Sequence, residues 1–435
     1  MLLRFRTANH RCFRDPVELS LVSARARGVI PAGGDWIGAT TRVAGIYGAN
    51  ASGKSTVLHA LEFLCSAVAR SATSWGDRDK FVHVPFALSH KHRSQNSTYE
   101  IDILVDGVRY TYGFESNVNG ISSEWLYSYP VGKRRLLFER IGEHEPRFVF
   151  GRTLQGENIT MSKLVRPTAL FLSVAANNNH PVLGRIHHRV ANHIRYAQFD
   201  ESDQDLRLKF VQKLIEDKEL QRQTEALLRF ADLGILRVEL SEREIDDEFR
   251  STVERILVAA RVGNTIDDVI GDLRKEIRFR HQSDDPGESI SFSLADESSG
   301  TKAWLSLAVP ALDSLKYGGT FLVDEIDSSL HPRLTAALIG IFKDPRINKS
   351  GAQLIFTSHD TSLMGPLLGK VLASDEIWFT EKGTDGSAEL SALEEFKFRD
   401  SDNFERRYLH GRYGAVPMVE LDVLRSLLTE TPTAQ

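Results

Sequence analysis

The chain has 435 residues, enough for two or three lobes around a large buried core, and its composition is ordinary for a soluble globular protein. Its formal net charge of −5 provides no overall attraction toward nucleic acid, although a local basic groove remains compatible with it. The two cysteines, Cys12 and Cys65, are too few for a disulfide framework or a zinc site. No apolar run approaches the roughly 18 residues of a membrane-spanning helix and the start lacks the plan of a signal peptide, so we expect a cytoplasmic protein with no membrane partner.

Strand and helix patterns alternate along the chain. Residues 43–47, VAGIY, form a β-rich run that leads through a Gly/Ser loop into a stretch with helical spacing. Between about 97 and 150, short alternating runs separated by Asp106-Gly107 and Asn119-Gly120 indicate antiparallel hairpins. Mostly helical periodicity extends from 160 to 275, and FLVDE and QLIFTS then indicate the buried strands of a last α/β section.

A phosphate-binding loop is the clearest motif. Residues 48–55, GANASGKS, match G-x-x-x-x-G-K-[ST] at every fixed position and lie between an expected strand and an expected helix. Glycines let backbone N–H groups approach phosphate oxygens, and the helix presents its positive end to the same anion. We expect Lys54 at the β- and γ-phosphates and the Ser55 hydroxyl on magnesium. The predicted ligands are ATP and Mg²⁺, with nucleotide contacts from Gly48, Asn50, Ala51, Ser52, Gly53, Lys54, Ser55 and Thr56.

An acidic strand end follows in the last section. Residues 320–325, TFLVDE, form an apolar strand that ends in two carboxylates. We expect Asp324 to hold magnesium, directly or through water, and Glu325 to polarise the attacking water as a catalytic residue. Neighbouring strand residues point to opposite faces, so only one carboxylate is expected to point straight at the metal. The alternative is a strand whose acidic end simply reaches the protein surface. The presence of a phosphate loop in the same chain argues against this alternative.

Residues 297–302, ESSGTK, precede an apolar helix-like stretch and the acidic strand. This segment resembles the signature of ABC ATPases, where a Ser-Gly turn begins a helix that contacts the γ-phosphate bound by a partner subunit. The resemblance implies that Ser299 and Gly300 bind nucleotide across a homodimer or a higher homo-oligomer. Taken alone, such a turn would more often be a helix cap.

Three further segments resemble motifs of ABC ATPases or of related ATPases, and two of them follow the acidic strand in the order that ABC ATPases show. Residues 327–332, DSSLHP, resemble a D-loop, and 357–360, TSHD, resemble the strand end that carries the switch histidine. The resemblance implies that His359 senses the γ-phosphate in catalysis, whereas a lone histidine at a strand end is usually structural. The opening NHRCF is similar to the Asn-Phe-Arg-Ser-Phe segment of RecF and SMC ATPases, which makes Arg11 a candidate nucleotide contact.

The segments ESSGTK, VDEIDSSLHP, QLIFTSHDTSLM, DEIWFTEK and YLHGRYGAVP together resemble a family of compact prokaryotic AAA/ABC-type ATPases that are RecF/SMC-like. The chain is similar to the ATPase components of anti-phage defence systems such as PARIS, Septu and RloA/RloB-like loci. This resemblance implies an α/β fold, namely an ABC-ATPase (P-loop) core with an antiparallel β subdomain and a mainly helical insertion. It also implies a sensor or scaffold ATPase that acts with a separate effector, such as a nuclease, encoded nearby.

The expected domain plan places the two parts of the ABC core at residues 1–160 and 286–435, with the helical insertion at 161–285. A Q-loop glutamine stays unassigned, because Gln95 is a poor candidate. Two further segments are interpreted as structural and not as functional sites. Asp246-Asp247-Glu248 is expected to be a solvated helix start, and Arg412-Tyr413-Gly414 is expected to be a C-terminal packing motif.

The sequence is compatible with more than one function. The segment ESSGTK departs from the Leu-Ser-Gly-Gly of transporters, which points away from transport. A RecF/SMC-like ATPase of DNA repair or maintenance, with DNA as a possible partner, is one alternative to the defence ATPase. A mainly structural scaffold, in which bound ATP stabilises an oligomer and turnover is slow or absent, is the other.

Overall fold

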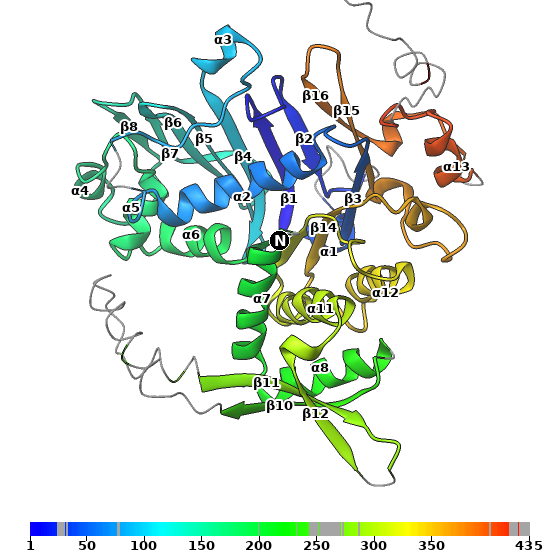
Figure 1. Cartoon of the computed structure of the whole chain (residues 1–435). Coiled ribbons are helices and arrows are strands. Elements are labelled where there is room, and N and C mark those ends of the chain that lie inside the picture. The colour runs from blue at the N-terminus through cyan, green and yellow to red at the C-terminus, as the bar shows by residue number, and fades with distance from the viewer. Residues whose placement is uncertain are drawn as a thin grey trace, which may run out of the picture.

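The computed structural model contains three β-sheets, with helices packed between and beside them (Figure 1). It describes residues 1–23, 31, 34–75, 79–198, 200–231, 233–242, 251, 271, 274–285, 288–399, 402–416 and 425. The acidic segment Asp246-Asp247-Glu248 lies outside the described residues. Within the described ranges, no helix combines the length and the apolar character needed to cross a membrane.

The core sheet has the strand order β16-β15-β3-β14-β13-β9. Neighbouring strands from β15 to β9 are parallel, and β16 is antiparallel to β15. The apolar runs of β3, β13 and β14 are buried along their whole length, as expected for parallel strands covered on both faces. The strands are β3 (Val43–Gly48), β9 (Ile194–Ala197), β13 (Thr320–Val323), β14 (Gln353–Thr357), β15 (Ile377–Lys382) and β16 (Ala388–Ala392).

The second sheet is antiparallel and has the order β2-β1-β4-β5-β6-β7-β8. The hairpins expected at Asp106-Gly107 and Asn119-Gly120 join β4 to β5 and β5 to β6. Asp106 and Gly107 have φ values of 48° and 77°, the left-handed pair that such a tight hairpin requires. The strands are β1 (Leu2–Ala8), β2 (Val17–Ser20), β4 (Ser97–Val105), β5 (Val108–Asn117), β6 (Gly120–Tyr129), β7 (Arg135–Ile141) and β8 (Arg147–Phe150).

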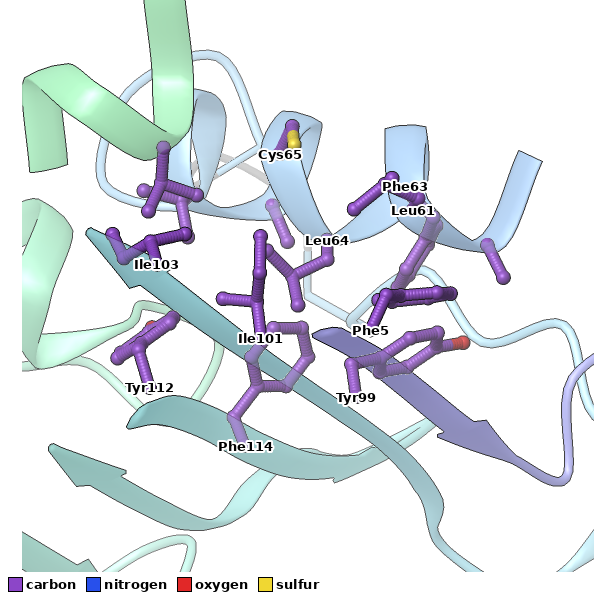
Figure 2. Close-up of a cluster of buried hydrophobic side chains, with 14 of the residues drawn as sticks. Phe5, Leu61, Phe63, Leu64, Cys65, Tyr99, Ile101, Ile103, Tyr112 and Phe114 are labelled. Carbon is purple, nitrogen blue, oxygen red and sulfur yellow. The ribbon is translucent and has the colours of Figure 1, made fainter. Parts of the chain in front are cut away.

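Helix α2 (Lys54–Arg70) packs on the antiparallel sheet and also contacts the core sheet. Figure 2 shows Leu61 and Leu64 of this helix above Ile101 and Phe114 of the antiparallel sheet. Each of these side chains is completely buried, and burial of one such side chain stabilises a fold by about 1.5–3 kcal/mol. The apolar face of α2 therefore fixes the helix whose N-terminus carries the phosphate loop.

The middle of the chain contains both helices and strands. Within the range 161–285, for which the sequence indicated mainly helices, β9 joins the core sheet, while β10 and β11 begin a three-stranded antiparallel sheet that β12 completes. The three-part division of the chain stays a prediction. The elements here are α4 (Asn158–Ser162), α5 (Phe171–Asn177), α6 (Leu183–Asn192), α7 (Glu201–Leu214), α8 (Lys218–Phe230), β10 (Ile235–Glu242), β11 (Lys275–Gln282) and β12 (Ser289–Ser293).

The remaining helices lie beside the core sheet or the antiparallel sheet, and the segment Arg412-Tyr413-Gly414 packs against the core sheet (Figure 1). Tyr413 is 1% exposed and stacks on Phe379 of β15 at a ring distance of 4.9 Å, which confirms the packing interpretation of that motif. The expected α/β fold class, with a P-loop core and an antiparallel β subdomain, is also confirmed. These helices are α1 (Trp36–Ala39), α3 (His90–Arg93), α11 (Ser299–Tyr317), α12 (Pro332–Lys343) and α13 (Phe404–Leu409).

Candidate nucleotide-binding site

The phosphate loop runs from the end of β3 to the start of α2. Its turn places Ala51 at φ 61° and Gly53 at φ 111°, conformations that glycine adopts at little cost. A Cβ atom on Gly48 would lie 2.5 Å from both the Ser52 hydroxyl oxygen and the Thr380 carbonyl oxygen, so only glycine fits there. The Ser52 and Thr380 hydroxyl oxygens are themselves 2.6 Å apart, which ties the loop to β15.

An open cavity of about 680 Å³ lies against this loop. Most of the residues expected at the site line it together, although they come from the loop after β1, the phosphate loop and the ends of β13 and β14. The lining residues are Arg11, Cys12, Asn50, Ala51, Ser52, Gly53, Lys54, Ser55, Thr56, Glu325 and His359.

Lys54 is the charged residue of the phosphate loop, and it is buried. Its side chain donates hydrogen bonds from Nζ to the carbonyl oxygens of Gly48 at 2.9 Å and Ala49 at 3.1 Å, and the residue is 6% exposed. Burial lowers the pKa of this ammonium, and the nearby carboxylates of Glu325 and Asp324 oppose that shift. An anion in the cavity would compensate the same buried charge, which suits this position for phosphate.

Ser55 and Asp324 bring two oxygen ligands together from different elements. The Ser55 hydroxyl donates to Oδ1 of Asp324 at 2.8 Å, and the Thr357 hydroxyl donates to the same oxygen at 2.6 Å. Thr357 also accepts a hydrogen bond from the backbone N–H of Glu325 at 2.8 Å. A hydroxyl and a carboxylate side by side match the oxygen ligands that magnesium prefers beside bound phosphates.

Asp324 and Glu325 face the same cavity, contrary to the expectation of opposite faces. Both line a second cavity of about 330 Å³ that also contains Ser55 and Arg11. The reason is local, because β13 ends at Val323 and Glu325 takes a left-handed φ of 50°. The strand alternation therefore no longer applies at these two positions.

His359 follows the end of β14 and is exposed. Its backbone N–H lies 3.2 Å from Oδ1 of Asp327, in the segment that resembles a D-loop. This contact joins the strand end that carries the histidine to the turn after β13. The imidazole is accessible from the cavity mouth, where a ligand or a second chain could reach it.

The signature-like turn lies apart from the cavity. In the described part of the chain, neither Ser299 nor Gly300 lines either cavity, and Ser299 is exposed. The turn begins α11, where the Ser298 hydroxyl accepts from the backbone N–H of Thr301 at 3.1 Å. A Cβ on Gly300 would lie 3.6 Å from the carbonyl oxygen of Ser329, so the turn sits beside the D-loop-like segment.

Gln198 is a site residue that sequence reasoning missed. It follows β9 directly, and the register of β9 and β13 sets Ala197 opposite Val323, one residue before Asp324. Gln198 lines the second cavity with Ser55 and Asp324. A glutamine after the strand-like run IRYA was the available signal, and the helical periodicity around it concealed it.

Gln95, by contrast, lies on an exposed turn after α3. Its carbonyl oxygen accepts from the side chain of Asn9 at 3.1 Å, and among the described residues it is no part of either cavity lining. Sequence reasoning did not assign Cys12 and Thr357 to the site, although they lie in the segments NHRCF and TSHD. It also missed His59, whose position carries no motif of its own.

Comparisons with known proteins place the chain in a family. No curated protein matches the chain significantly. It is similar to a solved SMC head bound to the C-terminal winged-helix domain of ScpA, with 13% identity and a TM-score of 0.46 over 91% of this chain and 98% of that chain. It is also similar to an Smc head domain with an extended coiled coil, bound to the C-terminal domain of ScpA derived from Pyrococcus furiosus. The identity there is 13% and the TM-score 0.43, over 91% of this chain and 97% of that chain. Residues 43–365, well over half of the chain, match one family throughout, and the chain belongs to that family, described as "AAA domain, putative AbiEii toxin, Type IV TA system".

Proposed function

We propose that the chain binds ATP with magnesium and hydrolyses it as a dimer, in which each nucleotide lies between two chains. One observation carries this proposal. The phosphate loop, Glu325 and His359 line one open cavity, whereas the exposed Ser299 and the partly exposed Gly300 lie outside it in the described part of the same chain. A second chain that placed its α11 N-terminus over the cavity would complete the site with an anion-binding helix end.

Binding rests on charge compensation. Lys54 and the N-terminus of α2 meet the β- and γ-phosphates, and the backbone N–H groups of the loop surround them. Ser55 and Asp324 would hold the magnesium ion, which supplies neutralisation of the charge that develops on the phosphate oxygens. Arg11 contacts the phosphates from the loop after β1.

Hydrolysis is assigned to Glu325. Its carboxylate accepts a proton from a water molecule, and the water oxygen attacks the γ-phosphorus. The bond from that phosphorus to the β,γ-bridging oxygen breaks, so ADP and inorganic phosphate leave. His359 contacts the γ-phosphate, and its backbone link to Asp327 relates that contact to the D-loop-like segment at the dimer surface.

ATP binding then closes the dimer, and hydrolysis opens it. The family description names a toxin of a type IV toxin–antitoxin system, which supports a regulated two-component system rather than housekeeping metabolism. On the resemblance of its motifs to such ATPases, we further propose that the chain is the sensor or regulatory ATPase of an anti-phage defence system and acts with a separate effector such as a nuclease. Phosphate release measured with and without the neighbouring gene product tests that partnership.

The variant Glu325→Gln tests the ATPase itself. It should bind ATP, run as a stable dimer in size-exclusion chromatography with light scattering, and release little phosphate. The matched control Glu389→Gln, on the exposed edge of β16, should behave as the wild type. A Glu325→Gln chain that stays monomeric with ATP and hydrolyses it at the normal rate would refute the role of Glu325.

A further inference from the structure

Four side chains form a continuous hydrogen-bonded series from the nucleotide cavity into the antiparallel sheet. Arg11 Nη2 lies 2.7 Å from His59 Nε2, His59 Nδ1 lies 3.1 Å from His10 Nε2, and His10 Nδ1 lies 2.7 Å from the Tyr99 hydroxyl. Arg11 and His59 line the cavity that holds Asp324 and Glu325. His10 and Tyr99 are completely buried.

The direction of the hydrogen bonds in this series follows from Arg11. A guanidinium can only donate, so His59 Nε2 must accept and carry no proton. The proton of a neutral His59 is then on Nδ1, which donates to His10 Nε2. His10 in turn carries its proton on Nδ1 and donates to the Tyr99 oxygen. One cation at the cavity therefore sets both tautomers.

Burial keeps both imidazoles neutral. It lowers the pKa of His59 to about 4, with a further contribution from the Arg11 charge, and that of His10 to about 3. A doubly protonated His59 would present a donor to the donors of Arg11. The neutral state is thus the one in which the contact between the two side chains is favourable.

Packing holds the rings in place. His10 stacks on His59 with ring centroids 5.3 Å apart and also contacts Phe63 at 5.7 Å. Phe63 of α2 in turn packs against Tyr99 of β4, with ring centroids 4.8 Å apart; both are labelled in Figure 2. The buried ring of His10 therefore supports one face of the His59 ring.

The backbone of Arg11 is fixed as well. Arg11 has a φ of 49°, and its backbone N–H donates to the carbonyl oxygen of Val84 at 2.9 Å. Backbone hydrogen bonds of 2.8 Å in both directions between His10 and Phe13 close the turn. Since the main chain is already set, the long Arg11 side chain is the one part whose direction needs a partner.

We propose that His59 is a positioning residue, whose neutral imidazole holds the Arg11 guanidinium over the phosphate-binding cavity. His10 and Tyr99 fix the ring of His59, and the remaining donors of Arg11 stay directed toward phosphate oxygens. The inference rests on the proposed nucleotide binding and adds a residue to it. The gain is preorganisation, because an arginine held in place loses less side-chain entropy when the ligand binds.

A double-mutant cycle tests the proposal. His59→Phe and His59→Leu remove the acceptor, His59→Gln keeps one, and Arg11→Ala removes the held group. The Kd and KM for ATP should rise about tenfold in the Phe and Leu variants while kcat stays within about twofold, and His59→Gln should recover most of the loss. In the Arg11→Ala background the same changes at His59 should have no further effect on ATP binding.

Additive losses in the Arg11→Ala background would overturn the inference, because they would mean that His59 acts only through packing. Melting temperatures of all variants, with His144→Phe on the exposed surface as control, separate unfolding from lost binding. Two acceptor-free variants are included so that a folding defect of one leaves the other. Wild type that binds no ATP would refute both proposals, whereas wild type that binds ATP with an additive cycle would refute this one alone.

Discussion

The hydroxyl of Ser55 lies 2.8 Å from Oδ1 of Asp324, so the first turn of α2 and the end of β13 meet at one carboxylate oxygen. The two residues are far apart in the sequence, and the core sheet brings them together by placing β14 between β3 and β13. The contact joins the phosphate loop to the residue proposed to hold magnesium.

Asp324→Asn keeps the size of this side chain and removes its charge. We expect phosphate release to fall at least about a hundredfold and the magnesium concentration for half-maximal turnover to rise, because an amide oxygen is a poor ligand for a hard cation. A magnesium titration of the steady-state rate measures both effects. Asp205→Asn, on the exposed surface of α7, is the control, and unchanged magnesium dependence in Asp324→Asn would contradict the assignment.

Lys54→Ala should abolish detectable ATP binding in titration calorimetry. The ammonium is buried against two carbonyl oxygens, so the folded chain already holds a desolvated charge at the place where phosphate would bind. Lys349→Ala, at an exposed lysine, should bind ATP as the wild type does. ATP binding of normal strength in Lys54→Ala would refute the phosphate site.

Mixing two inactive variants tests the shared site. A Cβ at Gly300 has room, with its nearest neighbour at 3.6 Å, so Gly300→Asp should fold and repel phosphate across the dimer. Gly300→Asp and Lys54→Ala chains should each be inactive, yet an equal mixture should recover about a quarter of wild-type turnover, because half the dimers would have one intact site. No recovery, in a mixture shown to form heterodimers, would argue against a site shared by two chains.

Gln198→Leu should lower kcat about tenfold and change the Kd for ATP little, because Gln198 lies beside Asp324 and Glu325 in the second cavity and outside the lining of the phosphate cavity. Gln95→Leu is the matched control, since that side chain is exposed. Steady-state phosphate release and fluorescent-nucleotide titration measure the two parameters. The assignment fails if the two glutamine variants behave alike.

Acid should destabilise the fold through His10 and His59. Their pKa values are lowered to about 3 and about 4 in the folded chain, so the unfolded chain binds these protons first as the pH falls below the usual histidine value of about 6.5. Above that pH both imidazoles are neutral in the folded and in the unfolded chain, so the free energy of unfolding keeps its full value. From pH 7.5 to 5.5 the buried His10 should cost about 1.4 kcal/mol of unfolding free energy, and the partly exposed His59 should cost less, because solvent screens its charge.

Denaturant unfolding at several pH values measures this effect. His59→Gln removes one of the two groups, and its stability should decrease less steeply between pH 7.5 and 5.5 than that of the wild type. Equal slopes for the two proteins would show that His59 is protonated in the folded chain at these pH values.

Local sequence was sufficient for the phosphate loop. The pattern from Gly48 to Ser55 depends on backbone conformation over a few residues, and the structure places these residues between β3 and α2 as expected. The hairpin turns at Asp106-Gly107 and Asn119-Gly120 were predictable for the same reason. Fold class followed, because buried parallel strands and alternating antiparallel strands leave different patterns of apolar residues.

Only the tertiary structure decided which distant residues share the site. Gln198 stands beside Asp324 because β9 pairs with β13, and strand order is a long-range property that periodicity within one segment does not encode. His59 looked like one more polar position of a helix until the packing of α2 set it between Arg11 and His10. Sequence by itself determined the chemistry of the phosphate loop, whereas the packing of sheets and helices determined which side chains surround it.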